Sequence, residues 1–231
     1  MQAIQQVAGG QVIVLDGKQL RRSDDRSLGK EAIYMVSAWA GAAGLVLAQK
    51  SVDEHSNEMT AIPQLLDLLD VGGCIVTIDA IGAQTKIAET IVNKGADYLL
   101  PVKDNQQTLL DDMRGVFTLD QSYDFKDAPY DHAHSVNKNH ARIEIQDCWC
   151  MSDPAYLLPV RDVGKWKALK SPVMLRAERI RGDKHEVKVR YYISSLETSA
   201  ARFLKLSRAG IKAKRLLCAW DEDYLLKVLA V

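Results

Sequence analysis

Residues 12–22 of the chain read VIVLDGKQLRR, a stretch that joins a buried strand to a charged edge. Its four apolar residues suit a strand covered on both faces, and they run directly into the carboxylate of Asp16. Gly17 follows, and three cations then crowd the next few positions: Lys18, Arg21 and Arg22. The pattern predicts an acid at the end of a strand, with a cationic rim beside it.

A second stretch repeats this arrangement, because residues 74–80 read CIVTIDA and set Asp79 after another apolar run. The glycine-containing turn AGAAG at 40–44 favours an antiparallel meander of the first three strands. The predicted strands are at 12–15, 33–39, 45–52, 74–80 and 97–103. The first predicted helix begins at an Asn57 cap and ends at the VGG at 71–73, and the second runs from Gln84 to Lys94 and is closed by Gly95. The third begins at an Asn105 cap and ends at about Gly115. The order βββαβαβα is the connectivity of the ribonuclease H fold, an α/β class.

In that fold the first and fourth strands are parallel neighbours, so Asp16 and Asp79 are expected to face each other at one edge of the sheet. Two close carboxylates repel, and a divalent cation such as Mg²⁺ relieves the repulsion. Two such ions about 4 Å apart activate a water and stabilise the leaving oxygen of a phosphodiester, and the cations after Asp16 would then contact phosphates. Taken singly, an Asp-Gly pair is also typical of an ordinary turn, and Asp79 of a cap or a surface acid.

The composition is typical of a globular domain and does not indicate a binding partner. The chain has 231 residues, 47% of them hydrophobic, and its 30 basic and 30 acidic side chains give no net charge, so any surface for nucleic acid must arise from local segregation of charge. The four cysteines include no C-x-x-C pair, which favours reduced, structural thiols. No apolar run approaches the ~20 residues of a membrane span, and we expect a soluble, cytoplasmic protein.

The second half of the chain has a different residue pattern. From Phe117 to Leu196 apolar and charged residues alternate in ARIEIQDCWC, SPVMLRAERI and HEVKVRYYI, which predicts an antiparallel, strand-rich segment. Residues 196–230 are predicted to be helical again. Three histidines, His132, His134 and His140, are expected in a polar loop of this segment, where exposure to solvent is the alternative to a contact with DNA.

Four stretches resemble the DDE transposases of bacterial insertion sequences, in the branch that includes the H-repeat-associated proteins of Rhs elements. They are VIVLDGKQLRRS at 12–23, the long segment at 45–106, HARIE at 140–144 and YYISSL at 191–196. The resemblance implies a ribonuclease H-like core, Mg²⁺- or Mn²⁺-dependent cleavage and strand transfer at transposon ends, and a strand-rich insertion before the last catalytic acid. Asp16 and Asp79 match the first two acids of the family's triad.

The third acid is where this sequence departs from the family. After YYISSL the family has a helix with the pattern His-Trp-x-Ile-Glu-Asn, whose glutamate completes the triad. Here residues 197–210 run directly into 211–231, which resemble the C-terminal end of full-length members, and that pattern is absent. We therefore expect an internal deletion, and a trimmed N-terminal region as well. The candidates for a replacement acid are Glu197 and Glu144, and the alternative for Glu144 is a salt bridge to Arg142 or solvent.

The resemblance also divides the chain into a core at 1–116, an insertion at 117–196 and a helical segment at 197–231. Within the insertion it makes Lys138, His140 and Arg142 the expected DNA contacts. It implies DNA as the partner, is compatible with a homo-oligomer, and implies neither a membrane nor a small-molecule cofactor. Two functions remain open: a transposase core that cuts and joins DNA, and a non-catalytic remnant that retains DNA or metal binding.

Overall fold

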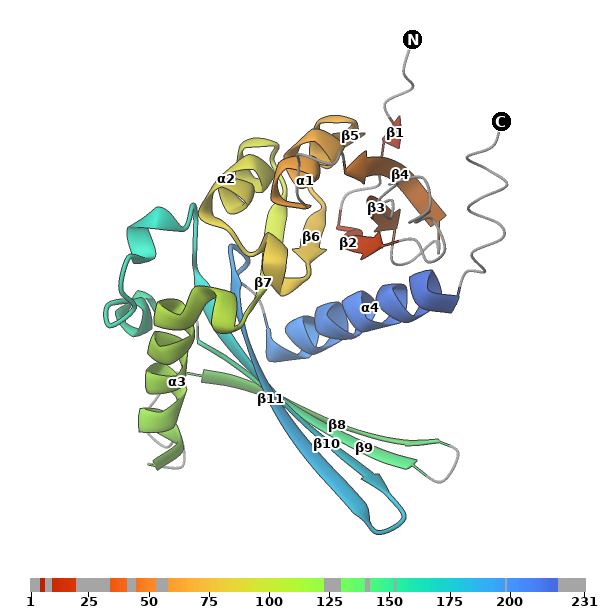
Figure 1. The fold of residues 1–231 in the computed structure, drawn as a ribbon. Helices are drawn as coiled ribbons and strands as arrows, with labels where there is room; N and C mark the ends of the chain where they lie inside the picture. The colour runs from red at the N-terminus through yellow and green to blue at the C-terminus, as the bar shows by residue number, and fades with distance from the viewer. Residues whose placement is uncertain are drawn as a thin grey trace, which may run out of the picture. The chain divides into compact units, whose positions relative to one another are not determined.

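The computed structural model describes residues 5–6, 10–19, 34–40, 45–52, 58–122, 130–139, 142–151, 153–197 and 199–219. The protein is of the α/β class and divides into two compact units, one formed by residues 1–96 with 208–231 and the other by residues 97–207 (Figure 1). None of the described helices is long and apolar enough to cross a bilayer.

The first unit contributes four neighbouring strands to the main sheet, in the order β4-β3-β2-β6. Its elements are β1 (Gln5–Gln6), β2 (Val12–Gln19), β3 (Tyr34–Ala40), β4 (Leu45–Val52), α1 (Glu58–Asp67), β5 (Leu69–Asp70), β6 (Ile75–Ile78), the 3₁₀ turn η2 (Ala80–Gly82) and α2 (Thr85–Asn93). Strand β3 is antiparallel to β2 and to β4, whereas β2 and β6 are parallel. The predicted meander and the predicted parallel pairing of the first strand with the fourth are both confirmed. The short strands β1 and β5 pair separately.

Both faces of this sheet are packed. On one face Gly82 packs closely against Ile78 of β6 and Ile62 of α1, since a methyl group added to Gly82 would come within 2.2 Å of Ile78 Cγ2 and 3.1 Å of Ile62 Cδ1. On the other face Val14 and Trp39 form a small buried cluster. Gly95 has the positive φ of +72° that the prediction for the end of α2 requires, and its N–H donates to the carbonyl of Val92 at 2.9 Å.

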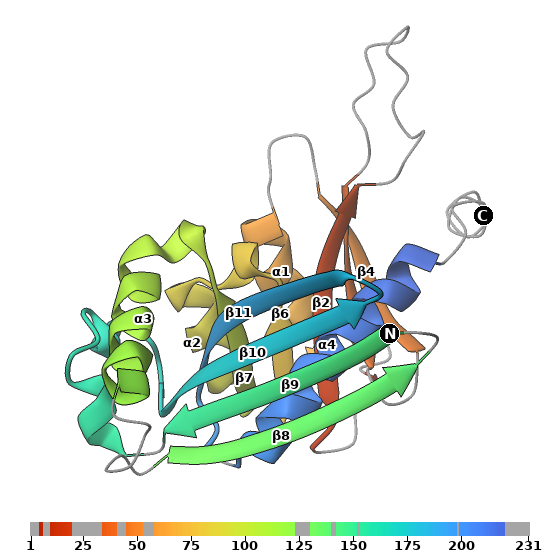
Figure 2. The same ribbon diagram turned by 90° about the horizontal axis from the view of Figure 1, so that it is seen from below.

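The second unit is dominated by antiparallel strands in the order β7-β11-β10-β9-β8. Its elements are β7 (Asp97–Val102), η3 (Asp104–Gln106), α3 (Gln107–Ser122), β8 (Tyr130–Asn139), β9 (Arg142–Met151), η4 (Pro154–Leu157), η5 (Val163–Lys165), β10 (Ser171–Arg181), β11 (Lys184–Ser194) and the start of α4 (Ala200–Ala219). Figure 2 shows β8, β9, β10 and β11 side by side as long strands. A tight turn at Gly182 and Asp183 joins β10 to β11.

Helix α3 is longer than predicted. We expected this helix to end near Gly115, but it runs to Ser122, and the expected boundary between residues 116 and 117 falls inside it. The reason is packing: Phe117 is fully buried, and its ring centroid lies 6.0 Å from that of Tyr191 on β11. Burial of this side chain outweighs the weak helix propensity of one glycine.

The structure also bears on the predicted positions of two histidines and two helix caps. His132 and His134 lie on strand β8 rather than in a loop. Of the two expected helix caps, Asn105 lies within the 3₁₀ turn η3 that precedes α3, and Asn57 is outside the described residues.

Candidate active site

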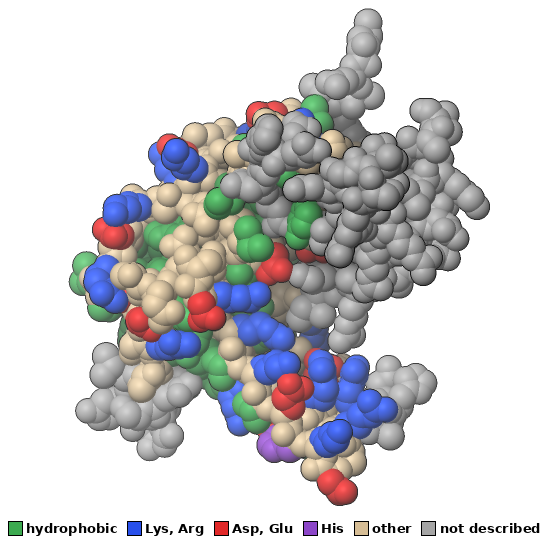
Figure 3. All heavy atoms as spheres, viewed as in Figure 1, with side chains coloured by type: hydrophobic (Ala, Val, Ile, Leu, Met, Phe, Trp, Pro, Cys, Tyr) green, Lys and Arg blue, Asp and Glu red, His purple; other side chains and the backbone are tan. Residues whose placement is uncertain are grey.

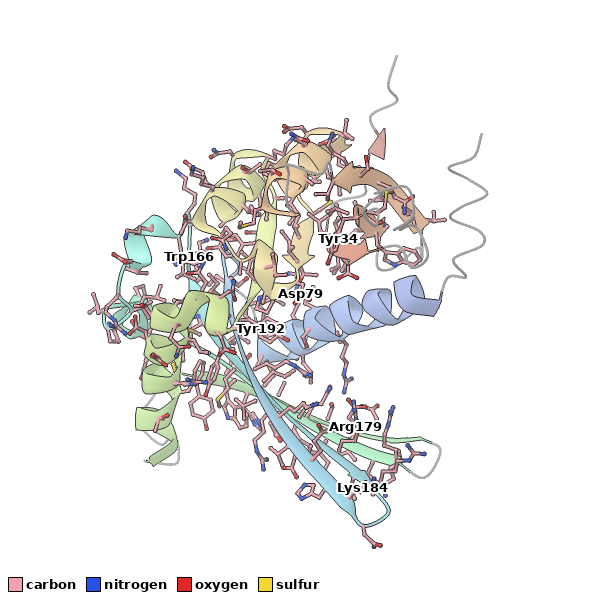
Figure 4. The ribbon with its side chains drawn as sticks, viewed as in Figure 1. Tyr34, Asp79, Trp166, Arg179, Lys184 and Tyr192 are labelled. Carbon is pink, nitrogen blue, oxygen red and sulfur yellow. The ribbon has the colours of Figure 1, made fainter. Side chains whose placement is uncertain are left out.

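Each of the two predicted acids directly follows the last residue pair of one parallel ladder. The parallel ladder of β2 and β6 runs from the pair Val12 and Ile75 to the pair Leu15 and Ile78, so the next residues on the two strands are Asp16 and Asp79. Asp79 keeps an extended backbone, with φ −66° and ψ 165°, and Figure 4 shows it at the end of β6. Neighbouring strands are about 4.8 Å apart, and residues at one level of a parallel ladder project from the same face.

Asp16 does not end its strand, contrary to our expectation. Strand β2 continues to Gln19, and the antiparallel ladder with β3 pairs Asp16 with Ser37 and Gly17 with Val36. The prediction that the strand stops at Asp16 is therefore wrong, and so is the alternative of an ordinary Asp-Gly turn. Only the ladder with β6 ends at this level. Paired with β3 through this stretch, Asp16 is only 8% exposed.

Polar residues on the neighbouring strands extend this site, and the sequence analysis did not identify them. Ser37 is buried beside Asp16, and its hydroxyl accepts a hydrogen bond from Gln49 Nε2 on β4 at 3.0 Å. Gln49, Ser37 and Asp16 thus form a polar row across three strands. The available signal was a single polar residue, Ser37, inside the otherwise apolar strand YMVSAWA.

Asp79 has a structural role at the same position. Its Oδ1 accepts a hydrogen bond from the N–H of Ala80 at 2.6 Å, and its carbonyl accepts one from the N–H of Gly82 at 2.9 Å. The alternative that Asp79 caps a helical turn is therefore confirmed. Capping also restricts the orientation of the carboxylate, so it is compatible with a second role for the same side chain.

The chemistry of this pair fits a hard divalent cation, because carboxylate oxygens are the ligands that Mg²⁺ prefers. Within the part of the chain that the structure describes, no three or more His, Cys, Asp or Glu side chains are grouped so as to hold a metal ion.

The two candidate third acids lie in the second unit. Glu144 lies on β9, where Arg142 and Arg179 approach it at 3.6 and 3.9 Å, so the predicted salt bridge to Arg142 is confirmed. Glu197 is exposed between β11 and α4.

The structure describes only some of the predicted cationic residues. Lys18 lies on β2 two residues after Asp16, and the placement of its side chain is not described. Arg21, Arg22 and His140 fall outside the described residues. Lys138 lies exposed on β8, and Arg142 lies on the adjacent strand β9.

The histidines of β8 contact an acid on β9. Asp147 Oδ1 lies 3.0 Å from His132 Nε2 and 2.8 Å from His134 Nδ1. The ring of His132 also stacks on Trp149, with ring centroids 4.9 Å apart. These contacts engage both histidines within the sheet.

The described cysteines behave as the prediction of structural thiols requires. Cys74, Cys148 and Cys150 are buried and make no disulfide. Burial raises the pKa of Cys148 and of Cys150 to about 12. Both thiols are therefore protonated and poorly nucleophilic at neutral pH.

Comparison with known proteins agrees with this architecture. Residues 8–209 match the family described as "Transposase DDE domain". The chain is 39% identical over 196 residues to "H repeat-associated putative transposase YhhI" of Escherichia coli K12, a match that covers 83% of this chain and 50% of the relative. It is 36% identical over 217 residues to "Putative transposase YncI" of E. coli O157:H7, covering 90% of this chain and 53% of the relative.

A third relative, "Uncharacterized protein in dhlA 3'region" of Xanthobacter autotrophicus, is 40% identical over 174 residues, covering 74% of this chain and 56% of the relative. The chain thus spans about half the length of these curated relatives. Its mixed α/β architecture is compatible with a ribonuclease H-like core. On the extent of these matches, the chain belongs to the DDE transposase family, in the branch of the H repeat-associated proteins.

Proposed function

We propose that this chain acts on DNA as part of an insertion-sequence transposase, and that Asp16 and Asp79 together hold a divalent cation, Mg²⁺ or Mn²⁺. The reaction class is cleavage and strand transfer at transposon ends. One observation carries the proposal: the ladder of β2 and β6 ends at Leu15 and Ile78, and the next residue on each strand is an acid.

The bound metal would activate the attacking oxygen and stabilise the leaving oxygen of a phosphodiester. The protein's own contribution is to hold the acids in place before the metal arrives. Asp16 is fixed by its ladder with β3, and Asp79 by its hydrogen bond to Ala80. Lys18, Arg21 and Arg22 follow Asp16 in the chain, and we assign them to phosphates of the DNA that approaches the metal.

A second candidate function is binding without cleavage. The sequence lacks the family's His-Trp-x-Ile-Glu-Asn pattern after YYISSL, and Glu144, one candidate replacement, is already shared by two arginines. A chain with two acids binds a cation and DNA but leaves the second metal position without its usual protein oxygen. Under this candidate Glu197 is the first residue to test as a substitute.

The test is a Mn²⁺-supported nicking assay on supercoiled plasmid, in which the chain is compared with its Asp79→Ala variant. Nicking that disappears with the substitution would support the catalytic function, and a Glu197→Ala variant would then show whether Glu197 is the third acid. Glu89→Ala, a change at an exposed position of α2, is the control for an indirect effect of losing one acid.

Absence of nicking, together with Mn²⁺ binding that requires both acids, would support the second candidate. Nicking that survives Asp79→Ala would overturn the assignment of Asp79.

A further inference from the structure

The ladders of the β8–β11 sheet sort its side chains onto two different faces. Residues directly opposite each other in an antiparallel ladder project from the same face, so the register fixes each side's composition. One side carries the residues that we call the basic face: Arg142, Glu144, Arg179, Arg181, Lys184, Glu186, Lys188 and Arg190. The remaining positions between them on this side are small, apolar or uncharged polar residues.

The basic face has a surplus of positive charge. Six cations share two carboxylates there, which leaves a formal charge of +4. The arginine ion pairs are long: Arg142 to Glu144 measures 3.6 Å, and Arg179 lies 3.9 Å from Glu144 and 4.0 Å from Glu186. Because these pairs lie near the limit of an ion pair, the guanidinium groups keep capacity for another anion.

Two cations of the basic face are more accessible to an anion than the paired arginines. Arg181 and Lys184, the last pair before the turn, are exposed and make no ion pair with any residue that the structure describes. Figure 3 shows Lys and Arg side chains gathered over β10 and β11, and Figure 4 labels Arg179 and Lys184 there.

The opposite face has a different character. It presents Val136, Val187 and Val189, which are 49%, 44% and 46% exposed. Its charges neutralise one another locally, since Glu178 binds both Arg176 and His185 and Asp147 binds both histidines of β8. Lys138 lies on this face, because the register connects it through Ile143 and Ile180 to His185.

We propose that the basic face binds the sugar-phosphate backbone of duplex DNA, independently of its sequence, and that the opposite face does not. This inference rests on the proposed function in taking DNA as the partner. Four rows of side chains along the strands span about 20 Å, which equals the length of about six phosphates of one DNA strand. Of the two described insertion residues expected to contact DNA, Arg142 lies on the basic face and Lys138 does not.

The sheet supplies a matched pair of substitutions. Lys184→Ala and Lys138→Ala remove the same charge from exposed positions on β11 and β8, in adjacent rows of the sheet, but from opposite faces. Binding of the full chain to a labelled duplex of arbitrary sequence is measured by fluorescence anisotropy in EDTA between about 50 and 200 mM NaCl. EDTA keeps the result independent of the metal site.

We expect Lys184→Ala to weaken binding roughly 5- to 10-fold near 0.1 M salt and to reduce the slope of log K against log salt by about 0.9, with a similar change for Arg181→Ala. Lys138→Ala should leave both quantities unchanged. Equal losses from both lysine variants, or a loss from Lys138→Ala alone, would overturn the assignment of the face and leave the proposed function standing. If the unmodified chain binds no duplex in EDTA, the basic-face proposal fails, and the Mn²⁺-supported nicking assay decides the proposed function separately. Circular dichroism of each variant checks that the sheet is intact.

Discussion

At the scale of single residues, the proposed pairing of Asp16 and Asp79 has an energetic consequence. Two like charges at the spacing of neighbouring strands, about 5 Å, repel by about 1–3 kcal/mol, and a bound divalent cation would offset this repulsion. We therefore predict that Asp16→Asn raises the melting temperature in EDTA. Mn²⁺ should stabilise the unmodified chain, by about 2.7 kcal/mol at a concentration 100 times its Kd, and should not stabilise the variant.

Differential scanning fluorimetry with and without Mn²⁺ measures both effects. Asp183→Asn, an exposed acid in the turn between β10 and β11, is the control that should change neither. An equal response of the variant and the unmodified chain to Mn²⁺ would remove Asp16 from the metal site.

Gly82 gives the second residue-scale prediction. A Cβ at this position would lie 2.2 Å from Ile78 Cγ2, and that methyl group is anchored one bond from the Ile78 Cβ. Gly82→Ala should therefore destabilise the chain by about 1–3 kcal/mol, as overpacking does elsewhere. Gly164→Ala is the matched control, since a Cβ there meets nothing within 4 Å.

Urea denaturation of the two glycine variants provides the comparison. Because Gly82 ends the turn that Asp79 caps, its variant should also bind Mn²⁺ more weakly. Equal stabilities of the two variants would show that the turn can shift to accept a methyl group.

At the scale of elements, α3 shows where sequence reasoning fails. The glycine at 115 indicated a helix end, but the pattern of buried residues Met113, Val116 and Phe117 continues through it. Local propensity and tertiary burial disagree here, and burial prevails. In β2 the end of the apolar run at Leu15 is also the end of the parallel ladder. Pairing with β3, which no local pattern reveals, carries the strand four residues further, to Gln19.

Helix α3 also allows a stabilising substitution. Gly115 is exposed within the helix, and a Cβ added there meets nothing within 4 Å. Gly115→Ala should therefore raise the free energy of unfolding by about 0.5–1 kcal/mol, because alanine loses less backbone entropy on folding. Urea denaturation measures the change. A lower stability would mean that the helix is interrupted at this residue in solution.

At the scale of the whole molecule, the buried cysteine thiols make the free energy of unfolding depend on pH. Burial raises the pKa of Cys148 and of Cys150 from 9.0 to about 12, and it also raises the pKa of Cys74. In the unfolded chain these thiols ionise near their ordinary value, so high pH favours unfolding. The stability they contribute is complete below about pH 9 and is lost as the pH rises to about 12.

Urea midpoints measured across the alkaline range should therefore fall in that window. A Cys148→Ala, Cys150→Ala double variant should show a shallower fall, although its stability at neutral pH is lower because the smaller side chains leave cavities. An equally steep fall in the double variant would place the alkaline sensitivity elsewhere, with the buried Tyr98, whose pKa is also raised, as the first residue to test.

The whole-chain charge shows what composition can and cannot reveal. A net charge of zero says nothing about partners, yet the basic face of the β8–β11 sheet carries a formal charge of +4. The alternation of Glu186, Lys188 and Arg190 is visible in the sequence as a period of two. Which residues of β8 and β9 share their side depends on register, and register is a property of paired strands rather than of any one segment.

The ladder that brings the two acids together also bears on the order of folding. Val12 and Ile75, which begin the β2–β6 ladder, are 63 positions apart, whereas the β10–β11 ladder closes around a two-residue turn. Closing a long loop costs more chain entropy and is slower than forming a hairpin, which takes about 1–10 μs. Pulse-labelling hydrogen exchange should therefore protect the amides of β10 and β11 before those of β6. The proposed acid pair therefore forms late, after the strands that carry the proposed basic face.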